Sequence, residues 1–423
     1  MIDRVIPGVS VETIAGEREA QLGTLGVVAM PLELSWGATV IEIERGDDTT
    51  ASLGYRLSDP AIKLVGEVMN YANKLILYRL TAGTQATGTL ASGITAKAVY
   101  GGKVGNNIKV VVVASGDNWS VKTFLGTVEM DEQIIAAPVD FQTNDFIQIE
   151  GTGTLAAATV SLTGGADATA DAEDYDAFLA EIQKYDYNVM AYTGSDSAIA
   201  NKLIGFIGEQ RESGTMVQLV QSVVSADDPA IYKSTIGGKT LNYDLTAAEA
   251  CATMAGIIAK CGIDSSATHF DGVEGWMDVS TRLTIEQQKT KTRAGELLFV
   301  LKNGKVIVLY DINSLITYTD QKPKDFHKGL VMRTLDSYQT DLQLLLDQKV
   351  IGKIRNGVDG RNQIKGMIAK MTVENYLNPG YVEGFTADDI TVIMGTDRDS
   401  VKATVGIRVV DTVDKIYVTV ISQ

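Results

Sequence analysis

The spacing of apolar residues changes along the chain, and each change predicts a different kind of structure. Between residues 95 and 163 the apolar residues fall in short β-rich runs such as TAKAVY, IKVVVVAS and ATVSLT, separated by turn signals such as GGKVGNN and GDN. Turns at intervals of roughly 8–12 residues are typical of a small β-sandwich or barrel. A Gly/Ala/Thr-rich stretch precedes these runs and Gly164-Gly165 follows them. We therefore predict an all-β insertion at residues 88–168.

After residue 168 the apolar spacing becomes helical. Tyr175, Phe178, Leu179 and Ile182 recur at intervals of three and four residues behind Asp171, a residue type that caps helices. The strand-like NVMAYT, the helical SAIANKLIGFIGEQ and the strand-like TMVQLVQS come next, and a further helix is expected from about residue 244 to 262. Such alternation predicts a sheet with helices packed on it.

The last third of the chain contains a hairpin, two helices and further strands. Asn303-Gly304 joins two apolar runs and predicts a tight hairpin, because both turn positions need a positive φ. Strands are expected at DITVIMG, VKATVGIRVV and KIYVTVIS. The helices are predicted from two apolar stripes, formed by Leu335, Tyr338, Leu342, Leu345 and Leu346 and by Ile364, Met367, Ile368 and Met371.

Both ends of the chain read as arms. Residues 1–22 hold too few large apolar groups for a core of their own, so we expect them to become ordered only against another surface. The chain is therefore predicted to be a multi-domain protein of mixed α/β and α+β class, with an α/β core, an inserted all-β domain and extended N- and C-terminal arms. The expected division is an N-terminal arm at 1–22, core at 23–87, the β-domain at 88–168, a central α/β domain at 169–345, a C-terminal core domain at 346–410 and a C-terminal strand or arm at 411–423.

Charge changes this picture in one region. The net charge of −16 argues against a general nucleic-acid binder, which needs a basic footprint. Lys322 to Lys370 nevertheless contains ten Lys/Arg and five Asp, a basic island in an acidic protein.

No secretory signal is expected, because no apolar core follows Arg4. No run of about 18 apolar residues predicts a membrane span.

A search for catalytic or metal-binding motifs gives little. Cys251 and Cys261 lie on the apolar side of a predicted helix and are expected to be buried small hydrophobes, which fits a reducing cytoplasm. His269 is expected to be a solvated or capping residue. Gly238-Lys239-Thr240 lacks the earlier glycine of a phosphate-binding loop, and Gly101-Gly102-Lys103-Val104-Gly105 has no helix after it, so both are predicted to be turns. We expect no enzyme activity, cofactor or metal.

Several phrases together resemble the contractile tail sheath family of myophages and phage-like bacteriocins. They extend from about residue 23 to the C-terminus, and the region 222–292 departs most from the family pattern. The phrases are GTLGVVAMPLELSWG, YGGKVGNNIKVVV, LTGGADA, YDINSLITYTDQKPKDFHKGLVMRTLDSYQTDL, VIGKIRNGVDGRNQIKG and VVDTVDKIYVTVIS.

The resemblance implies a tail-sheath fold and a structural subunit that polymerises as stacked hexameric rings around a tail tube. It implies contraction by rigid-body rearrangement, which drives the tube through a target envelope. The partners would be further copies of the chain, the tube protein, the baseplate and the tail terminator, without nucleic acid or membrane. The subunit would be made and assembled in a bacterial cytoplasm and would reside in a virion tail or phage-like particle.

Two alternatives remain open at this point. The same sheath would serve a headless bacteriocin or another contractile injection system. A reading from a different class is a cytoplasmic α/β enzyme with a β accessory domain, which would need a pocket with convergent polar groups.

Specific residues carry the expected contacts. The arms would complete sheets in neighbouring subunits by strand addition, the other possibility for the last strand being an edge strand of its own subunit. Some residues of the basic island would attract the tail tube, unless the island is a solvated surface or pairs with acidic neighbours. The strand-exchange residues are Val5, Val9, Val11, Ile416, Val418 and Val420, and the tube-facing candidates are Lys349, Lys353, Arg355, Arg361 and Lys365.

Overall fold

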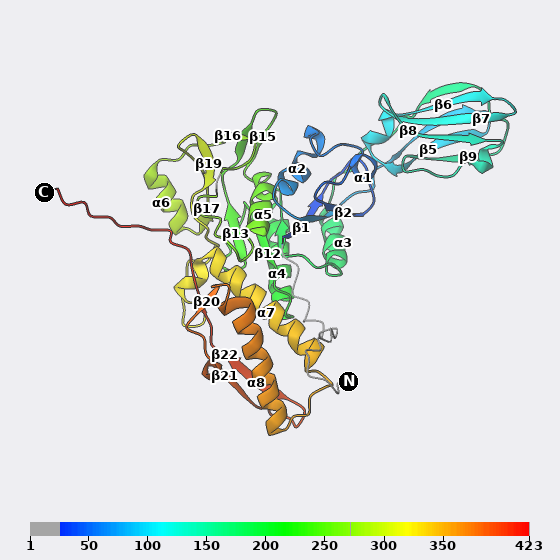
Figure 1. Ribbon diagram of the computed structural model, residues 1–423. Coiled ribbons are helices and arrows are strands. Elements are labelled where there is room, and N and C mark those ends of the chain that lie inside the picture. Colours follow the sequence, from blue (N-terminus) through cyan, green and yellow to red (C-terminus); the bar gives the residue numbers. More distant parts are fainter. Residues whose placement is uncertain (1–25, 271, 423) are drawn as a thin grey trace, which may run out of the picture.

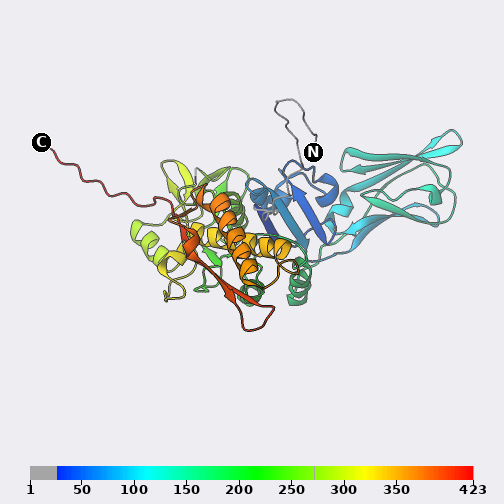
Figure 2. The ribbon, with the colours of Figure 1, turned by 60° about the horizontal axis from the view of Figure 1, so that its bottom comes forward.

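A computed structural model describes residues 26–270 and 272–422 of the chain (Figure 1). A central α/β body carries a β-sandwich at one end and a helical lobe on another side, and the C-terminal segment extends away from all three (Figures 1 and 2). This arrangement confirms the predicted α/β core with an inserted all-β domain. The predicted N-terminal arm, with Val5, Val9 and Val11, lies outside the described residues.

The central body is built on a seven-stranded sheet in which β2 alone runs antiparallel to its neighbour. Its inner strands come from runs such as VVAM and LIL, which are apolar at successive positions because both faces of a parallel sheet are covered. In sheet order the strands are β17 (Glu296–Leu297), β13 (Ile231–Ser234), β12 (Gln218–Gln221), β11 (Val189–Ala191), β1 (Val27–Leu32), β3 (Lys74–Arg79) and β2 (Val40–Glu44).

Helices cover the two faces of this sheet, as the sequence predicted. Val28 and Met30 of β1 point into one core, while Val27 and Ala29 point into the other, as strand periodicity requires. The predicted cap of α3 is confirmed, since Asp171 accepts hydrogen bonds from two main-chain N–H groups. On the first face lie α2 (Lys63–Met69) and α5 (Ala250–Cys261), and on the second α3 (Ala172–Ile182) and α4 (Ser197–Glu212).

Smaller elements complete the central body beside β17. The predicted hairpin is confirmed, since Asn303 and Gly304 have φ values of 52° and 78° and join β18 to β19. Gly238-Lys239-Thr240, predicted to be a turn, is instead strand β14, because β15 and β16 supply hydrogen-bond partners on both sides. The elements are β14 (Gly238–Thr240), β15 (Asp244–Leu245), β16 (Trp276–Val279), α6 (Ile285–Arg293), β18 (Phe299–Lys302) and β19 (Lys305–Val308). The short helix α1 (Thr50–Leu53) lies near β2, at the other end of the sheet.

The inserted domain is a sandwich of a three-stranded and a four-stranded sheet. Trp36 of the central body is 0% exposed and packs into the sandwich core, edge-on to Tyr100 and stacked on Phe146. The prediction of a simple turn at residues 101–105 is wrong, because Lys103–Asn107 forms a 3₁₀-helix. The sheets contain β4 (Gln85–Ala91), β5 (Ile94–Gly101) and β9 (Ile147–Gly151), and β10 (Ala158–Ser161), β6 (Ile108–Ser115), β7 (Asn118–Leu125) and β8 (Val128–Ile135).

The helical lobe follows from the two predicted apolar stripes. Tyr338 and Leu345 of α7 and Ile364 and Ile368 of α8 are buried, as expected. One continuous helix, α7, runs from the central body into the lobe and does not break at residue 345. The elements are α7 (Gly329–Lys349), α8 (Val358–Thr372) with a π-helical turn after it (Val373–Leu377), β20 (Val382–Glu383), β21 (Ile390–Met394), β22 (Val401–Val405) and β23 (Arg408–Val409).

Candidate assembly surfaces

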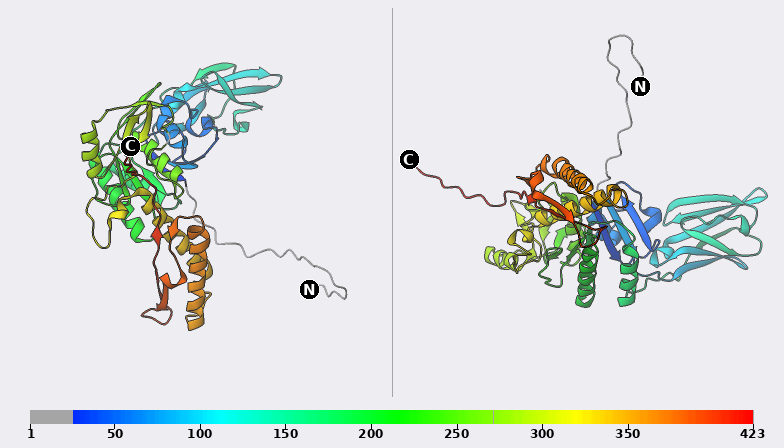
Figure 3. Two further views of the ribbon diagram at one scale, coloured as in Figure 1. Left: turned by 60° about the vertical axis from the view of Figure 1, so that its left-hand side comes forward. Right: turned by 90° about the horizontal axis from the view of Figure 1, so that it is seen from below.

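The C-terminal segment exposes apolar side chains. Residues 410–422 form no helix or strand, so the strand expected at 416–421 is absent from the described subunit, and so is the alternative edge strand. A lone extended segment has no hydrogen-bond partners of its own and forms a strand only beside another. The segment projects away from the rest of the chain (Figure 3). From residue 413 onward its large apolar side chains are between 76% and 91% exposed, and they are Val413, Ile416, Tyr417, Val418, Val420 and Ile421.

The root of this segment is fixed to the central body. Lys328 is 8% exposed, and its ammonium group pairs with Asp411 at 3.3 Å and with Asp414. The same group lies 4.5 Å from the centre of the Tyr310 ring, a cation–π distance. Burial alone would lower the pKa of Lys328, but the two carboxylates raise it above its ordinary value. The segment is therefore held as far as Asp414 and leaves the body beyond it.

The helical lobe offers open strand edges. Strands β21 and β22 pair only with each other within residues 26–270 and 272–422, so each has an outer edge without a ladder partner there. Helix α8 covers one face of this pair through Ile364 and Ile368. Unpaired edges present rows of N–H and C=O groups to another strand. One subunit thus carries, within its described residues, both an extended C-terminal segment outside any sheet and strand edges without a ladder partner.

The five basic candidates lie around the end of α7 and the start of α8. Lys353 and Arg355, in the connection between these helices, are exposed, whereas the other three are partly buried. Arg361 donates to the main-chain and side-chain oxygens of Asn356 at 3.3 and 3.1 Å. Among the described residues, no carboxylate forms a salt bridge with Lys353, Arg355, Arg361 or Lys365.

Most of the other basic residues of the island are paired with carboxylates within the subunit. Lys322 pairs with Asp228, Lys370 with Glu374, and the guanidinium of Arg333 with Asp311. The sequence showed the island as one stretch, but the fold divides it into a part paired with acidic side chains and a part at the α7–α8 connection.

Buried ion pairs attach α7 to the central body. The Arg333 guanidinium lies 2.9 Å from Asp311, which is 0% exposed, and also donates to main-chain oxygens of Gly262 and Ser265. Burial alone would raise the pKa of Asp311, but the charge of Arg333 outweighs it and holds that pKa below its usual range. A second pair joins Arg211 to Asp336 at 2.6 Å. Sequence reasoning missed these residues, because no motif relates their positions.

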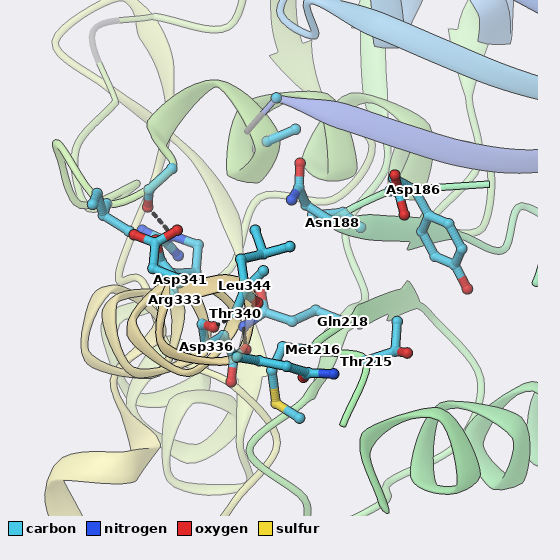
Figure 4. A pocket seen from close by; sticks show the side chains of 18 of the residues that line it. Asp186, Asn188, Thr215, Met216, Gln218, Arg333, Asp336, Thr340, Asp341 and Leu344 are labelled. Carbon is cyan, nitrogen blue, oxygen red and sulfur yellow. Dashed lines mark hydrogen bonds between the residues drawn. The ribbon is translucent and has the colours of Figure 1, made fainter. Parts of the chain in front are cut away.

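A hollow of about 470 Å³ lies beside α7 (Figure 4). It opens at the amino ends of β11 and β12, whereas ligands of open α/β sheets bind at the carboxyl ends of strands. Its polar lining includes Asp186, Asp336, Asp341 and Asp347. In the described parts of the chain, no group of three His, Cys, Asp or Glu side chains has an arrangement that could hold a metal ion.

The two cysteines are buried and unpaired, as predicted. Burial raises the pKa of the Cys251 thiol well above its ordinary value, which disfavours the reactive thiolate. His269 is exposed in a loop. Over residues 26–270 and 272–422, no helix combines the length and apolarity needed to cross a membrane.

Four family models match consecutive parts of the chain. They are the tail sheath protein Gp18 domain III N-terminal region at residues 26–80, the phage tail sheath protein beta-sandwich domain at 81–167, the phage tail sheath protein central domain at 168–314 and the phage tail sheath C-terminal domain at 321–422.

Individual proteins are similar over the whole length. The phage-like element PBSX protein XkdK of Bacillus subtilis is 30% identical, over 97% of this chain and 95% of its own. The crystal structure of a sheath tail protein from Desulfitobacterium hafniense is 32% identical, with a TM-score of 0.86 over 96% of this chain and 98% of its own. The helical sheath of the anti-feeding prophage in its contracted state shares the fold, with a TM-score of 0.59 at 14% identity over the full length of both chains.

Proposed function

Because this chain belongs to the phage tail sheath family, we propose that it polymerises as the structural subunit of a contractile sheath. The subunits form stacked hexameric rings around a tail tube, in contact with a baseplate and a tail terminator. The observation that carries the proposal is the C-terminal segment, which is fixed at Asp414 and exposes apolar side chains beyond it. Such a segment is costly in water unless another surface covers it.

Strand addition between subunits covers this segment. Ile416, Val418 and Val420 lie on one side of an extended chain and Tyr417 and Ile421 on the other, so both faces gain from burial. Burying a Val or Ile side chain contributes about 1.5–3 kcal/mol, while ordering a residue costs about 1–2 kcal/mol in backbone entropy. The balance is close, so main-chain hydrogen bonds to an open edge such as that of β22 decide the outcome. Val5, Val9 and Val11 act in the same way in the N-terminal arm.

Contraction is a rearrangement of whole subunits. A segment held at one end and paired with a neighbour at the other gives heterologous contacts, which propagate into an open helix. The extended sheath stores free energy at assembly, and each subunit then rotates and moves outward as a rigid body to drive the tube through a target envelope. The similarity to a sheath in its contracted state supports a fold compatible with this end state. Neither nucleotide nor enzymatic activity is required.

The tube is held by the basic residues at the α7–α8 connection. Lys349, Lys353, Arg355, Arg361 and Lys365 lie within one stretch of the helical lobe, and four of them lack a carboxylate partner among the described residues. Exposed charges attract over about 8–10 Å at physiological salt, so such contacts steer assembly and are broken without a large barrier. The same sheath would serve a phage tail, a headless bacteriocin or another contractile injection system, assembled in the bacterial cytoplasm.

The triple variant Ile416→Ser, Val418→Ser and Val420→Ser tests strand addition. We expect the purified parent protein to form wide tubular polymers in electron micrographs, and the variant to stay a folded monomer with an unchanged circular dichroism spectrum. The matched control is Val128→Ser, Ile134→Ser and Val139→Ser, three exposed apolar residues of the β-sandwich domain. Tubes formed as readily by the first variant as by the parent would refute the proposal.

A further inference from the structure

We propose that Lys328, Asp411 and Asp414 form a latch that sets the free length of the C-terminal segment. With the latch closed, the segment is free from Lys415 onward, and with the latch open it is free from Asp411 onward. The inference rests on the proposed function in one respect, that the far end of the segment pairs with a neighbouring subunit. Its consequence is that the link between two subunits lengthens during contraction while their strands stay paired.

Two attachments hold the start of the segment on two different parts of the subunit. The first is on the helical lobe, where β23 pairs with β20 and the main-chain N–H of Val410 donates to the carbonyl oxygen of Tyr381 at 2.9 Å. The second is on the central body, where the ammonium group of Lys328 pairs with Asp411 and Asp414. The chain therefore crosses from the lobe to the body within four residues, and the rest projects away from both (Figure 3).

The second attachment is made by side chains alone. Beyond Val410, no main-chain hydrogen bond joins the segment to the other residues that the structure describes. The hydrogen bonds of Thr412 stay within the segment. Lys328 supplies the ion pairs, and the ammonium group of Lys415 lies 5.5 Å from the centre of the Tyr310 ring. Because the segment belongs to no helix or sheet here, this attachment can open without breaking an element of the fold.

The charges around Tyr310 favour opening in one step. The side chains of Lys328 and Asp414 are each only 10% exposed, so salt screens their attraction weakly. The ammonium groups of Lys328 and Lys415 lie 4.5 and 5.5 Å from the centre of the same Tyr310 ring. These two like charges repel each other, and Asp414 compensates them while it is in place. Once Asp414 leaves, the repulsion drives Lys415 away as well, so a half-open latch is disfavoured.

Opening adds length where a moving neighbour needs it. The four residues 411–414 span at most about 14 Å when they are extended. Outward movement of whole subunits enlarges each ring, so a segment paired with a neighbour in the same ring has a wider gap to cross. Ile416, Val418 and Val420 lie beyond the latch, so their strand pairing is retained while the four residues extend.

Distances between two spin labels test the latch in the full-length monomer. One label is attached at Val413→Cys, an 80% exposed position between the two carboxylates, and the other at the exposed Thr290→Cys on α6; the two native cysteines are buried. We expect a distance distribution about twofold wider in Lys328→Met than in the doubly labelled parent. The matched control is Lys322→Met, which removes an exposed ion pair of the same basic island and should leave the distribution narrow. Equal widths in Lys328→Met and the control would overturn the inference.

A second variant opens the latch from the other side. Asp411→Asn with Asp414→Asn leaves the central body unchanged and removes both carboxylate partners of Lys328. It should widen the distribution as Lys328→Met does, so a folding defect of Lys328→Met cannot explain the result. A narrow distribution in this double variant would contradict the role given to the two carboxylates.

The same labels follow the latch in the assembled sheath. Labelled subunits are diluted into unlabelled ones, so that only distances within one subunit are measured. We expect the monomer distance in the extended sheath and a shift of up to about 14 Å after contraction. An unchanged distance after contraction would refute the opening. Failure of the parent to form tubes would contradict the proposed strand addition instead, and the monomer comparison would still decide whether Lys328 holds the segment.

Discussion

Arg333 is a buried guanidinium that joins three parts of the chain. It contacts Asp311 after β19, Gly262 and Ser265 after α5, and the hydroxyl of Tyr232 on β13. The two charges can be buried together because each has a charged partner and hydrogen bonds, which offset the cost of removing an ion from water.

Replacing one partner of this pair should cost more than replacing both. Arg333→Met leaves the Asp311 carboxylate buried without its cation, and we expect a loss of about 3–5 kcal/mol in the free energy of unfolding. The double variant Arg333→Met with Asp311→Asn should regain part of this loss, since the amide still accepts from the Ala267 N–H. Urea unfolding of the monomer measures both. Strictly additive losses would contradict the assignment.

Glu67 on α2 is a buried carboxylate of a different kind. It accepts hydrogen bonds from the side chains of Thr253, Trp276 and Tyr243, which are neutral donors. Burial raises the pKa of Glu67, and these hydrogen bonds oppose the shift only in part. The folded protein therefore binds a proton at Glu67 more tightly than the unfolded chain does.

The sign of this shift gives a pH prediction. The contribution of Glu67 to stability is complete below the unfolded pKa of about 4.3 and is lost as pH rises through the higher pKa of the folded protein. The parent should therefore lose stability relative to Glu67→Gln as pH rises above about 4.3, because the raised pKa of Glu67 in the folded protein lies above that value. Urea unfolding at a series of pH values measures this difference, and Glu286→Gln, on the exposed α6, is the matched control. A difference that does not change with pH would show that Glu67 is not the group responsible.

At the scale of elements, the positions of α7 and α8 determine which basic side chains are already paired within the subunit and which can contact the tube. The charges at the start of α7 are already paired, Lys328 with Asp411 of the C-terminal segment and Arg333 with Asp311 of the central body. The connection to α8 carries Lys353 and Arg355, with Arg361 one turn into the next helix. The proposed contact with the tube therefore belongs to one end of this helix pair.

Charge reversal at that end should weaken binding to the tube. Arg361→Glu with Lys365→Glu changes the net charge by four, and we expect reduced co-assembly with tube protein, most clearly at low salt, because screening is weakest there. The fold should persist, since Ile364 and Ile368 still face the core. The control is Lys289→Glu with Lys302→Glu, an equal change at exposed positions far from α8. Co-sedimentation with tubes measures the effect, and parent-like binding by the first variant would refute the assignment.

At the scale of the whole molecule, the β-sandwich is an appendage with a fixed attachment. Its two connections lie side by side, because Thr84 and Ala166 form a bridge. Trp36 and the side chain of Arg79, which donates to main-chain oxygens of Ala82 and Gly101, join it to the central body. The chain enters and leaves the β-sandwich at one place, so the domain can be excised without breaking another element. Its removal would nevertheless expose the side chains that pack between it and the central body.

Excising residues 85–165 with a short glycine linker tests this view. We expect the remaining chain to fold, with a lower melting temperature because Trp36 loses its cover, and to polymerise through its arms. The uncovered Trp36 side chain should also lower the solubility of the remaining chain. Adding Trp36→Ser should restore the solubility but not the melting temperature, since the aromatic packing is gone. Calorimetry and electron microscopy measure the two effects. Loss of all folded structure would show that the sandwich is required for the central body to form.

The local pattern of the sequence determined much of this protein. Helical spacing behind Asp171 predicted α3, Asn303-Gly304 predicted the β18–β19 hairpin, and apolar stripes predicted α7 and α8. These features depend on residues close together in the chain, so the periodicity and turn chemistry suffice. Gly238-Lys239-Thr240 shows the limit, because β15 and β16, which make it a strand, are set by tertiary packing.

Only the tertiary structure decided which charges remain available and where the C-terminal segment lies. Asp311 and Arg333 are 22 residues apart and Arg211 and Asp336 are 125 apart, and no sequence spacing predicts such pairs. The same pairing neutralises part of the basic island and leaves the α7–α8 connection uncompensated. The sequence determined that residues 416–421 have the composition of a strand, but a strand needs a partner edge. Within the described subunit the segment pairs with no such edge, because its root is held at Lys328 and the rest projects away from the body.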